Sequence, residues 1–314
     1  MAAIETNGVS KRFDETHAVR DVDLTVESGE VFGFLGPNGA GKSTTINMLL
    51  DFVRPTTGAI SILGVDPQEQ PRVVRRRTGV LPEGYAFYDR LPGRRHVELA
   101  IDMYESDDDP IAILDRVGLT GDEDTAVGTY SKGMRQRLAL GIALVDDPDL
   151  LILDEPSSGL DPNGIRTLRE IVREEADYGT TVFLSSHVLD QVEAVCDRVA
   201  IMNDGTLLTV DTVDGLRDTL DPNSTLVLSV DAVPDSAPQR LAELDRVDGV
   251  DVDSASEDHG GTISITCTDS GVKSAAIGRV EEAGATVTDI GVEDSSLEEL
   301  FAAYTDSSSD GERR

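Results

Sequence analysis

The sequence predicts an α/β protein built on a parallel sheet and followed by a small α+β domain. Three observations predict this fold class. Before about residue 220, short apolar runs of strand length alternate with segments of helical periodicity, which is typical of buried parallel strands joined by helices. A glycine-rich pattern that binds phosphate stands between one such strand and a helix. Beyond residue 220 the patterns follow the order strand, helix, strand, strand, helix, strand, which indicates a split βαβ unit.

The phosphate-binding pattern lies in residues 36–44, which read GPNGAGKST. Glycine permits positive φ and a close approach of the backbone, so the amides of such a loop can surround an anion. Lys42 is expected to bind the β- and γ-phosphates, and Ser43 to bind Mg²⁺. An accidental glycine-rich turn is the weaker alternative, because an apolar strand precedes the loop and a helical pattern follows it. The predicted nucleotide-binding residues are Gly36, Pro37, Asn38, Gly39, Ala40, Gly41, Lys42, Ser43 and Thr44.

A second cluster, LLILDEPSSGLDP, occupies residues 150–162. Asp154 and Glu155 follow its apolar run, at the carboxyl end of a strand where α/β sheets place their ligands. Asp154 is expected to support Mg²⁺, and Glu155 to act as the general base on the attacking water. A helix cap is the alternative for such a pair of acids, and the phosphate-binding loop upstream in the same chain weakens it.

Two further segments carry candidate phosphate contacts. His187 ends the apolar run TTVFLSSH; a lone histidine is usually structural, but this position would let it bond the γ-phosphate. Ser131 precedes a helical pattern in GTYSKGMRQRLALGIALVDDP, where it is expected to cap the helix and create a second anion site.

Together these motifs resemble the ATP-binding subunit of an ABC transporter, in particular the exporter-type branch associated with multidrug and antibiotic resistance. The resemblance covers about residues 3–220, with Walker A (GPNGAGKST), signature (YSKGM, then RQR), Walker B (LLILDEP) and D-loop (SGLD) motifs in the family's order. It implies a P-loop NTPase core that hydrolyses Mg²⁺-ATP, with Glu155 and His187 as catalytic residues. It also implies that Phe13 stacks on adenine and that Asp161 ends the D-loop.

The resemblance explains why one chain would need two anion sites. In this family two subunits pair head to tail, and each signature segment caps the ATP held by the other subunit. A homodimer is therefore expected, in which the capping residues are Ser131, Lys132, Gly133 and Met134. Lys132 and Met134 depart from the usual LSGGQ signature, in a form that is common in the exporter-type branch.

The segment GVLPEGYAFYDRL carries Glu83 where many relatives have the Q-loop glutamine. A carboxylate also offers oxygen to a metal, so Glu83 joins Ser43 and Asp154 as a predicted Mg²⁺ ligand. Three aromatics follow it (Tyr85, Phe87 and Tyr88), and arginine-rich runs flank it at residues 72–77 and 94–95. The aromatics either anchor a partner or fill the local core. The arginines either contact a partner or form a solvated face.

Composition and charge restrict the class of protein. The 314 residues include 60 acids and 27 Lys or Arg, for a net charge of −33, which opposes nucleic-acid binding. Acidity with few lysines indicates adaptation to high salt, as in a halophilic archaeon; a mesophilic acidic protein is the alternative. Cys196 and Cys267 lack the spacing of a disulfide framework or zinc site.

The predicted domains are residues 1–220 (the ABC ATPase, with a helical subdomain at about 84–148), 221–305 (a ferredoxin-like α+β domain whose SLEELF ending resembles an exporter accessory domain) and 306–314 (a disordered tail). No run reaches the ~20 apolar residues that span a bilayer. The predicted function is therefore ATP-driven export through a separately encoded integral-membrane permease, from the cytoplasmic face of the cell membrane. The alternatives are a soluble ABC ATPase of repair, translation or cofactor assembly, and a non-hydrolysing scaffold, against which Glu155 and His187 argue.

Overall fold

The computed structural model describes residues 1–220, 224–234, 236–242, 244, 247–254, 261–267 and 272–294. The chain divides into two compact units, Met1–Val213 and Asp214–Arg314, so the division lies seven residues before the predicted one. The predicted closing helix and tail lie outside the described residues. Within the described part of the chain, no helix combines the length and apolar character needed to cross a membrane.

The first unit is organised around a six-stranded sheet with the strand order β5-β6-β7-β3-β8-β9. Neighbours pair in parallel from β5 to β8, and β9 pairs antiparallel with β8. Every residue of β3, β6 and β7 is buried, as their apolar runs predict. The strands are β3 (Val31–Leu35), β5 (Thr78–Leu81), β6 (Leu150–Asp154), β7 (Thr181–Ser186), β8 (Arg198–Asn203) and β9 (Thr206–Thr212).

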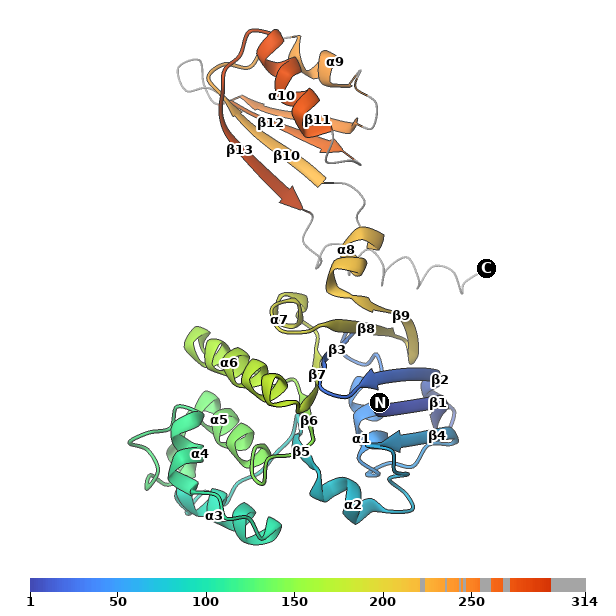
Figure 1. The fold of residues 1–314 in the computed structure, drawn as a ribbon, viewed down its shortest axis with the longest axis vertical. Helices are drawn as coiled ribbons and strands as arrows, with labels where there is room; N and C mark the ends of the chain where they lie inside the picture. The colour runs from blue at the N-terminus through green and yellow to red at the C-terminus, as the bar shows by residue number, and fades with distance from the viewer. Residues whose placement is uncertain are drawn as a thin grey trace. The chain divides into compact units, whose positions relative to one another are not determined.

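A second, antiparallel sheet of three strands has the order β2-β1-β4 (Figure 1). Helix α1 contacts β2 and β4 of this sheet and β6 of the large sheet, so it packs between the two. Their side chains form one hydrophobic core, in which Leu24, Met48 and Phe183 are fully buried. The elements are β1 (Ala2–Phe13), β2 (Thr16–Glu27), α1 (Lys42–Leu49) and β4 (Thr57–Ile62).

Between β5 and β6 the chain leaves the sheet and forms a group of mutually contacting helices (Figure 1). They occupy the segment where the sequence predicts a helical subdomain. The group comprises α3 (Gly93–Tyr104), α4 (Pro110–Arg116), a 3₁₀ turn (Val127–Thr129) and α5 (Lys132–Ala143). Three further helices pack against strands of the large sheet. They are α2 (Pro71–Arg76), α6 (Pro162–Tyr178) and α7 (Leu189–Glu193).

The second unit contains a four-stranded antiparallel sheet with the order β11-β12-β10-β13. Its chain order of strand, helix, strand, strand, helix, strand confirms the predicted split βαβ arrangement. Helices α9 and α10 cover one face of this sheet. The helices and the sheet share a separate hydrophobic core, in which Leu226, Ile265 and Val280 are buried. The elements are α8 (Val213–Leu220), β10 (Ser224–Val230), α9 (Ala237–Ala242), β11 (Val247–Ser254), β12 (Gly261–Cys267), α10 (Val272–Glu282) and β13 (Val287–Asp294).

Candidate nucleotide-binding and catalytic site

The loop between β3 and α1 has a backbone that only glycine can form. Gly41 has φ 106°, and a Cβ there would lie 2.5 Å from the Ala18 carbonyl oxygen. A Cβ on Gly36 would lie 2.4 Å from the Met202 carbonyl oxygen. Gly41 also occupies the N-cap position of α1 and has no side chain with which to cap it. The loop therefore presents the amides and positive dipole end of α1 to an anion.

The structure brings most of the predicted nucleotide residues to one cleft of about 320 Å³. This volume lies within the ~300–1,000 Å³ of typical ligand sites. Phe13, at the end of β1, is not among the lining residues; it is half-exposed, with the Lys11 ammonium 4.9 Å from its ring centre. The cleft is lined by Ala18, Pro37, Asn38, Gly39, Gly41, Lys42, Ser43, Thr44, Glu83 and Glu155.

Lys42 is the buried cation of this cleft. Its ammonium donates to the Gly36 carbonyl oxygen at 2.6 Å and lies 3.6 Å from Glu155 Oε1. Both side chains are almost fully buried, so their charges interact more strongly than a surface pair would. The positive charge therefore stands between the loop carbonyls and the carboxylate that ends the Walker B segment.

Asp154 is held at the last position of β6 by its neighbour on β7. The Ser185 hydroxyl donates to Asp154 Oδ1 at 2.5 Å. Burial raises the pKa of the Asp154 carboxyl above its ordinary value, and the nearby Glu83 and Glu155 carboxylates add to this rise. Hydrogen bonds from Ser185 and Ser43 act in the opposite direction on that pKa. A divalent cation at this place would remove the electrostatic cost of the ionised form.

The oxygen atoms near Asp154 fit Mg²⁺. Ser43 Oγ lies 3.5 Å from Glu83 Oε2, and Ser43 and Glu83 both affect the pKa of Asp154, so three oxygen-bearing side chains lie close together beside the phosphate loop. Hard oxygen donors suit Mg²⁺, which commonly takes one or two protein ligands together with substrate phosphates and water. No group of three His, Cys, Asp or Glu side chains among the described residues forms a metal site by itself.

Glu155 and His187, the two residues predicted to be catalytic, lie in contact with each other. Glu155 Oε2 lies 2.9 Å from His187 Nδ1, while its buried Oε1 accepts no hydrogen bond from the described residues. The Glu155 backbone has φ 49°, an uncommon value for a residue with a side chain. The carboxylate is thus fixed between the Lys42 ammonium and the imidazole, where it could take a proton from a water beside the γ-phosphate.

The signature and D-loop segments lie against each other and outside the lining of the cleft. Ser131 caps α5, accepting from the Met134 amide at 3.2 Å, which confirms the predicted cap. The Lys132 ammonium donates to Ser158 Oγ at 3.1 Å. Asp161 caps α6 by accepting from the Gly164 amide at 2.8 Å. The signature residues therefore do not join the cleft that holds this chain's own phosphate loop.

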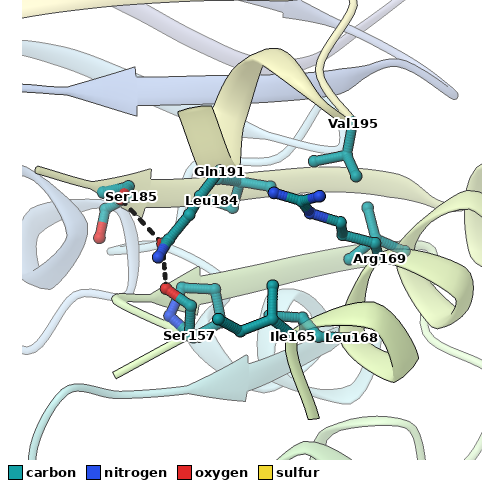
Figure 2. Close-up of a pocket in the computed structure, with 11 residues that line it drawn as sticks. Ser157, Ile165, Leu168, Arg169, Leu184, Ser185, Gln191 and Val195 are labelled. Atoms are coloured by element: carbon teal, nitrogen blue, oxygen red, sulfur yellow. Dashed lines mark hydrogen bonds between the residues drawn. The ribbon is translucent and has the colours of Figure 1, made fainter. Parts of the chain in front are cut away.

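Ser157, the residue before the D-loop, contacts α7, the helix that follows His187. Figure 2 shows Ser157 and Gln191 pointing toward each other, and the Ser157 hydroxyl donates to Gln191 Oε1. They stand at one end of a small apolar pocket between α6, α7 and β7. Its walls include Ile165, Leu168, Leu184 and Val195 (Figure 2).

The contacts of two polar residues of the site escape sequence reasoning, although one of them, Gln136, stands in the RQR run of the signature motif. Ser185 lies in an apolar strand, and only the pairing of Asp154 with Ser185 between β6 and β7 assigns it a role. Gln136 lies inside α5 and donates to the Pro156 carbonyl oxygen at 2.9 Å. The sequence gives a faint signal for both, because polar residues inside apolar patterns require a partner.

The match to known proteins decides the family. Residues 19–158 match the family model described as ABC transporter. The chain is 34% identical over 310 residues to the daunorubicin/doxorubicin resistance ATP-binding protein DrrA of Streptomyces peucetius, covering 96% of this chain and 92% of that protein. The chain belongs to the ATP-binding subunits of ABC transporters. It is an ABC ATPase, a protein that binds and hydrolyses ATP.

Other relatives agree with this assignment. The ABC ATPase is 37% identical to the bacitracin transport ATP-binding protein BcrA of Bacillus licheniformis, over 68% of this chain and 71% of that one. A solved ATP-binding subunit of an ABC transporter superposes with a TM-score of 0.64 at 31% identity, over 69% of this chain and 92% of the other. The dimeric, ADP- and Pi-bound cassette MJ0796 has the same fold, with a TM-score of 0.61 at 22% identity, over 67% of this chain and 98% of the other.

Proposed function

We propose that this ABC ATPase energises export through a separate integral-membrane permease, as a peripheral subunit on the cytoplasmic face of the membrane. The observation that carries the proposal is the match over nearly the whole chain to a drug-resistance ATP-binding protein, accessory unit included. The family of drug- and antibiotic-resistance subunits is thereby favoured over the repair, translation or cofactor-assembly ATPases. The transported substrate is determined by the permease, which forms the path.

In the proposed reaction, residues of this chain bind and orient ATP and take a proton from the attacking water. The loop amides and Lys42 would hold the β- and γ-phosphates of ATP, and Phe13 would stack on the adenine. Ser43, Glu83 and Asp154 would hold Mg²⁺, which would supply positive charge to offset the negative charge of the phosphates. Glu155 would take a proton from the attacking water. His187 would hold the Glu155 carboxylate in place and hydrogen-bond the γ-phosphate. The 2.9 Å contact between Glu155 and His187 supports this pairing.

The proposed assembly is a head-to-tail homodimer of ATPase subunits. The signature residues Ser131, Lys132, Gly133 and Met134 would cap the partner's ATP. Their position outside the lining of their own cleft supports this role, as does the capped N-terminus of α5, which favours an anion. ATP would join the two subunits, and loss of the γ-phosphate would release them.

The proposed docking surface for the permease is the aromatic loop after Glu83. Tyr88 is 70% exposed, whereas Tyr85 and Phe87 are half-buried. Phe87 and Tyr88 both pack on buried His96, with ring centres 5.1 and 6.1 Å away, and the Tyr88 amide donates to His96 Nε2 at 3.0 Å. The loop is therefore exposed in part only: one aromatic faces solvent and two contribute to a local core.

The arginines beside this loop form ion pairs with neighbouring acids or lie on an exposed helix face. Arg77 pairs with Asp149 at 2.6 Å, and Arg94 pairs with Asp124 at 2.8 Å. In α2, Val74 is the buried residue, while Arg72, Arg75 and Arg76 are exposed. A solvated face accounts for these arginines, so the docking proposal depends on the aromatics.

Replacing Tyr88 with alanine is expected to reduce recovery of the permease at least several-fold when the tagged ATPase is purified from membranes of cells that express both. The reason is that an exposed aromatic in a loop with a fixed backbone is a typical interface anchor. Phe87→Ala tests the same surface but also removes a packed ring. Tyr178→Ala, at an 85% exposed tyrosine of α6, is the matched control. Full recovery of the permease with both Tyr88→Ala and Phe87→Ala would show that the docking surface lies elsewhere. If the wild-type ATPase recovers no permease, the proposal that it is a transporter subunit is contradicted.

We also propose that the chain is adapted to high salt and comes from a halophilic archaeon. At −33 the charges repel one another when the Debye length is long, about 30 Å at 0.01 M against about 3 Å at 1 M. The melting temperature, followed by circular dichroism, is expected to rise by at least ~10 °C between 0.05 and 2 M KCl. Equal melting temperatures at the two concentrations would count against the adaptation.

A further inference from the structure

The catalytic turn after β6 needs external support. Glu155 has the left-handed φ of 49°, and a non-glycine residue keeps such a backbone only where its surroundings hold it. On the amino side, the Glu155 amide donates to Ser185 Oγ at 3.0 Å. On the carboxyl side, the Glu155 carbonyl oxygen accepts from the Ser158 amide at 3.1 Å. The turn is thus tied within itself and to β7, and a third attachment comes from the helical subdomain.

That third attachment is the side chain of Gln136, which is 5% exposed. Its Nε2 donates to the Pro156 carbonyl oxygen at 2.9 Å and lies 3.5 Å from the Glu155 carbonyl oxygen. Both carbonyls belong to the turn that carries the catalytic carboxylate. A buried amide with good partners is held in one orientation, so it can fix the peptide planes that follow Glu155.

The other end of the same amide reaches the loop that carries Glu83. Gln136 Oε1 accepts from the Tyr85 hydroxyl at 2.8 Å. A continuous chain of hydrogen bonds therefore runs from Tyr85 through Gln136 to the backbone at Glu155. Gln136 also shares α5 with Ser131, the cap of that helix.

We propose that Gln136 is a positioning residue for hydrolysis: it orients the Glu155 carboxylate through the backbone of the turn, and Tyr85 orients Gln136. The proposal rests on the proposed role of Glu155 as the base. Movement of α5 or of the Tyr85 loop would change the position of the base through this amide. A residue that only stabilises the fold would lower the melting temperature and leave kcat per folded molecule unchanged.

The test uses Gln136→Met in the full chain, because methionine keeps the length and volume of glutamine and removes its hydrogen bonds. We expect kcat to fall at least about tenfold, since small misplacements of a reacting group are costly, while KM for ATP and the affinity for a fluorescent ATP analogue change less than about twofold. Hydrogen exchange at the backbone of residues 155–161 is expected to accelerate with no nucleotide added. Thr180→Val, which removes a buried 3.0 Å hydrogen bond to Glu175 Oε2 outside the predicted site residues, is the control and should change neither kcat nor this exchange.

Tyr85→Phe removes the second half of the chain of bonds with little change of shape. We expect a fall in kcat of about threefold, and the double variant should be no slower than Gln136→Met alone, because both act through one amide. If Gln136→Met fails to fold, Tyr85→Phe still tests whether Gln136 positions the base. Wild-type kcat or unchanged exchange in a folded Gln136→Met protein, or wild-type values of both in Tyr85→Phe, would overturn the proposal. Turnover by Glu155→Gln would instead overturn the base assignment, which the exchange measurement does not use.

Discussion

Replacing Lys42 with alanine is expected to abolish ATP binding, whereas Glu155→Gln is expected to keep ATP binding and lower turnover by at least about 10²-fold. Lys42 places the buried charge of the cleft beside the loop carbonyls, so its loss removes the direct attraction for the β- and γ-phosphates. Glutamine keeps the shape of Glu155 but cannot take a proton from water, and general-base catalysis contributes about 10²–10⁴-fold.

The measurements are equilibrium titration with a fluorescent ATP analogue and release of phosphate with Mg²⁺-ATP. Because Lys42 and Glu155 are a buried pair 3.6 Å apart, removing one partner also destabilises the fold, and circular dichroism must show that each variant is folded. Glu170→Gln, at an exposed position of α6, is the matched control and should behave as the wild type. Turnover by Glu155→Gln near the wild-type rate would refute the assignment of the base.

The parts of the site that the sequence predicts are local ones. The phosphate loop, the acids after β6 and the cap at Ser131 each depend on residues close together in the chain. Apolar runs also predict the buried strands β3, β6 and β7, because a parallel sheet covered on both faces needs continuous apolar sequence. Sequence periodicity similarly predicts the split βαβ unit, whose central strands β10 and β12 alternate buried and less buried residues.

The parts that escape prediction depend on which elements become neighbours. Ser185 has a role only because β7 lies beside β6 in the sheet, and no local pattern specifies strand order. Gln136 meets the catalytic turn only because α5 packs there. The sequence also leaves open whether the aromatics after Glu83 anchor a partner or fill the local core. Phe87 and Tyr88 pack on buried His96, which stands in a helix that no local pattern connects to that loop.

ATP is expected to double the mass of the Glu155→Gln protein, and Ser131→Arg in the same background is expected to keep it monomeric. The Glu155→Gln change preserves bound ATP by stopping turnover. In the proposed dimer the capped N-terminus of α5 faces the partner's γ-phosphate, and an arginine would fill that space with bulk. The expected loss of dimer affinity is at least about 100-fold, because the arginine blocks both caps of a symmetric pair.

The second variant, Ser131→Asp, separates loss of the helix cap from loss of the phosphate contact. Ser131 Oγ accepts from the Met134 amide at 3.2 Å, and aspartate caps a helix as well as serine does, so α5 should begin unchanged. Its negative charge would nevertheless repel the phosphate, and the protein should stay monomeric with ATP. Light scattering with Mg²⁺-ATP, and with Mg²⁺ alone as the reference, measures the mass in 1–2 M KCl, where general charge repulsion is screened. A dimer of unchanged affinity in either Ser131 variant would refute the head-to-tail arrangement. A residue that caps the partner's ATP could tolerate neither the added bulk of arginine nor the negative charge of aspartate.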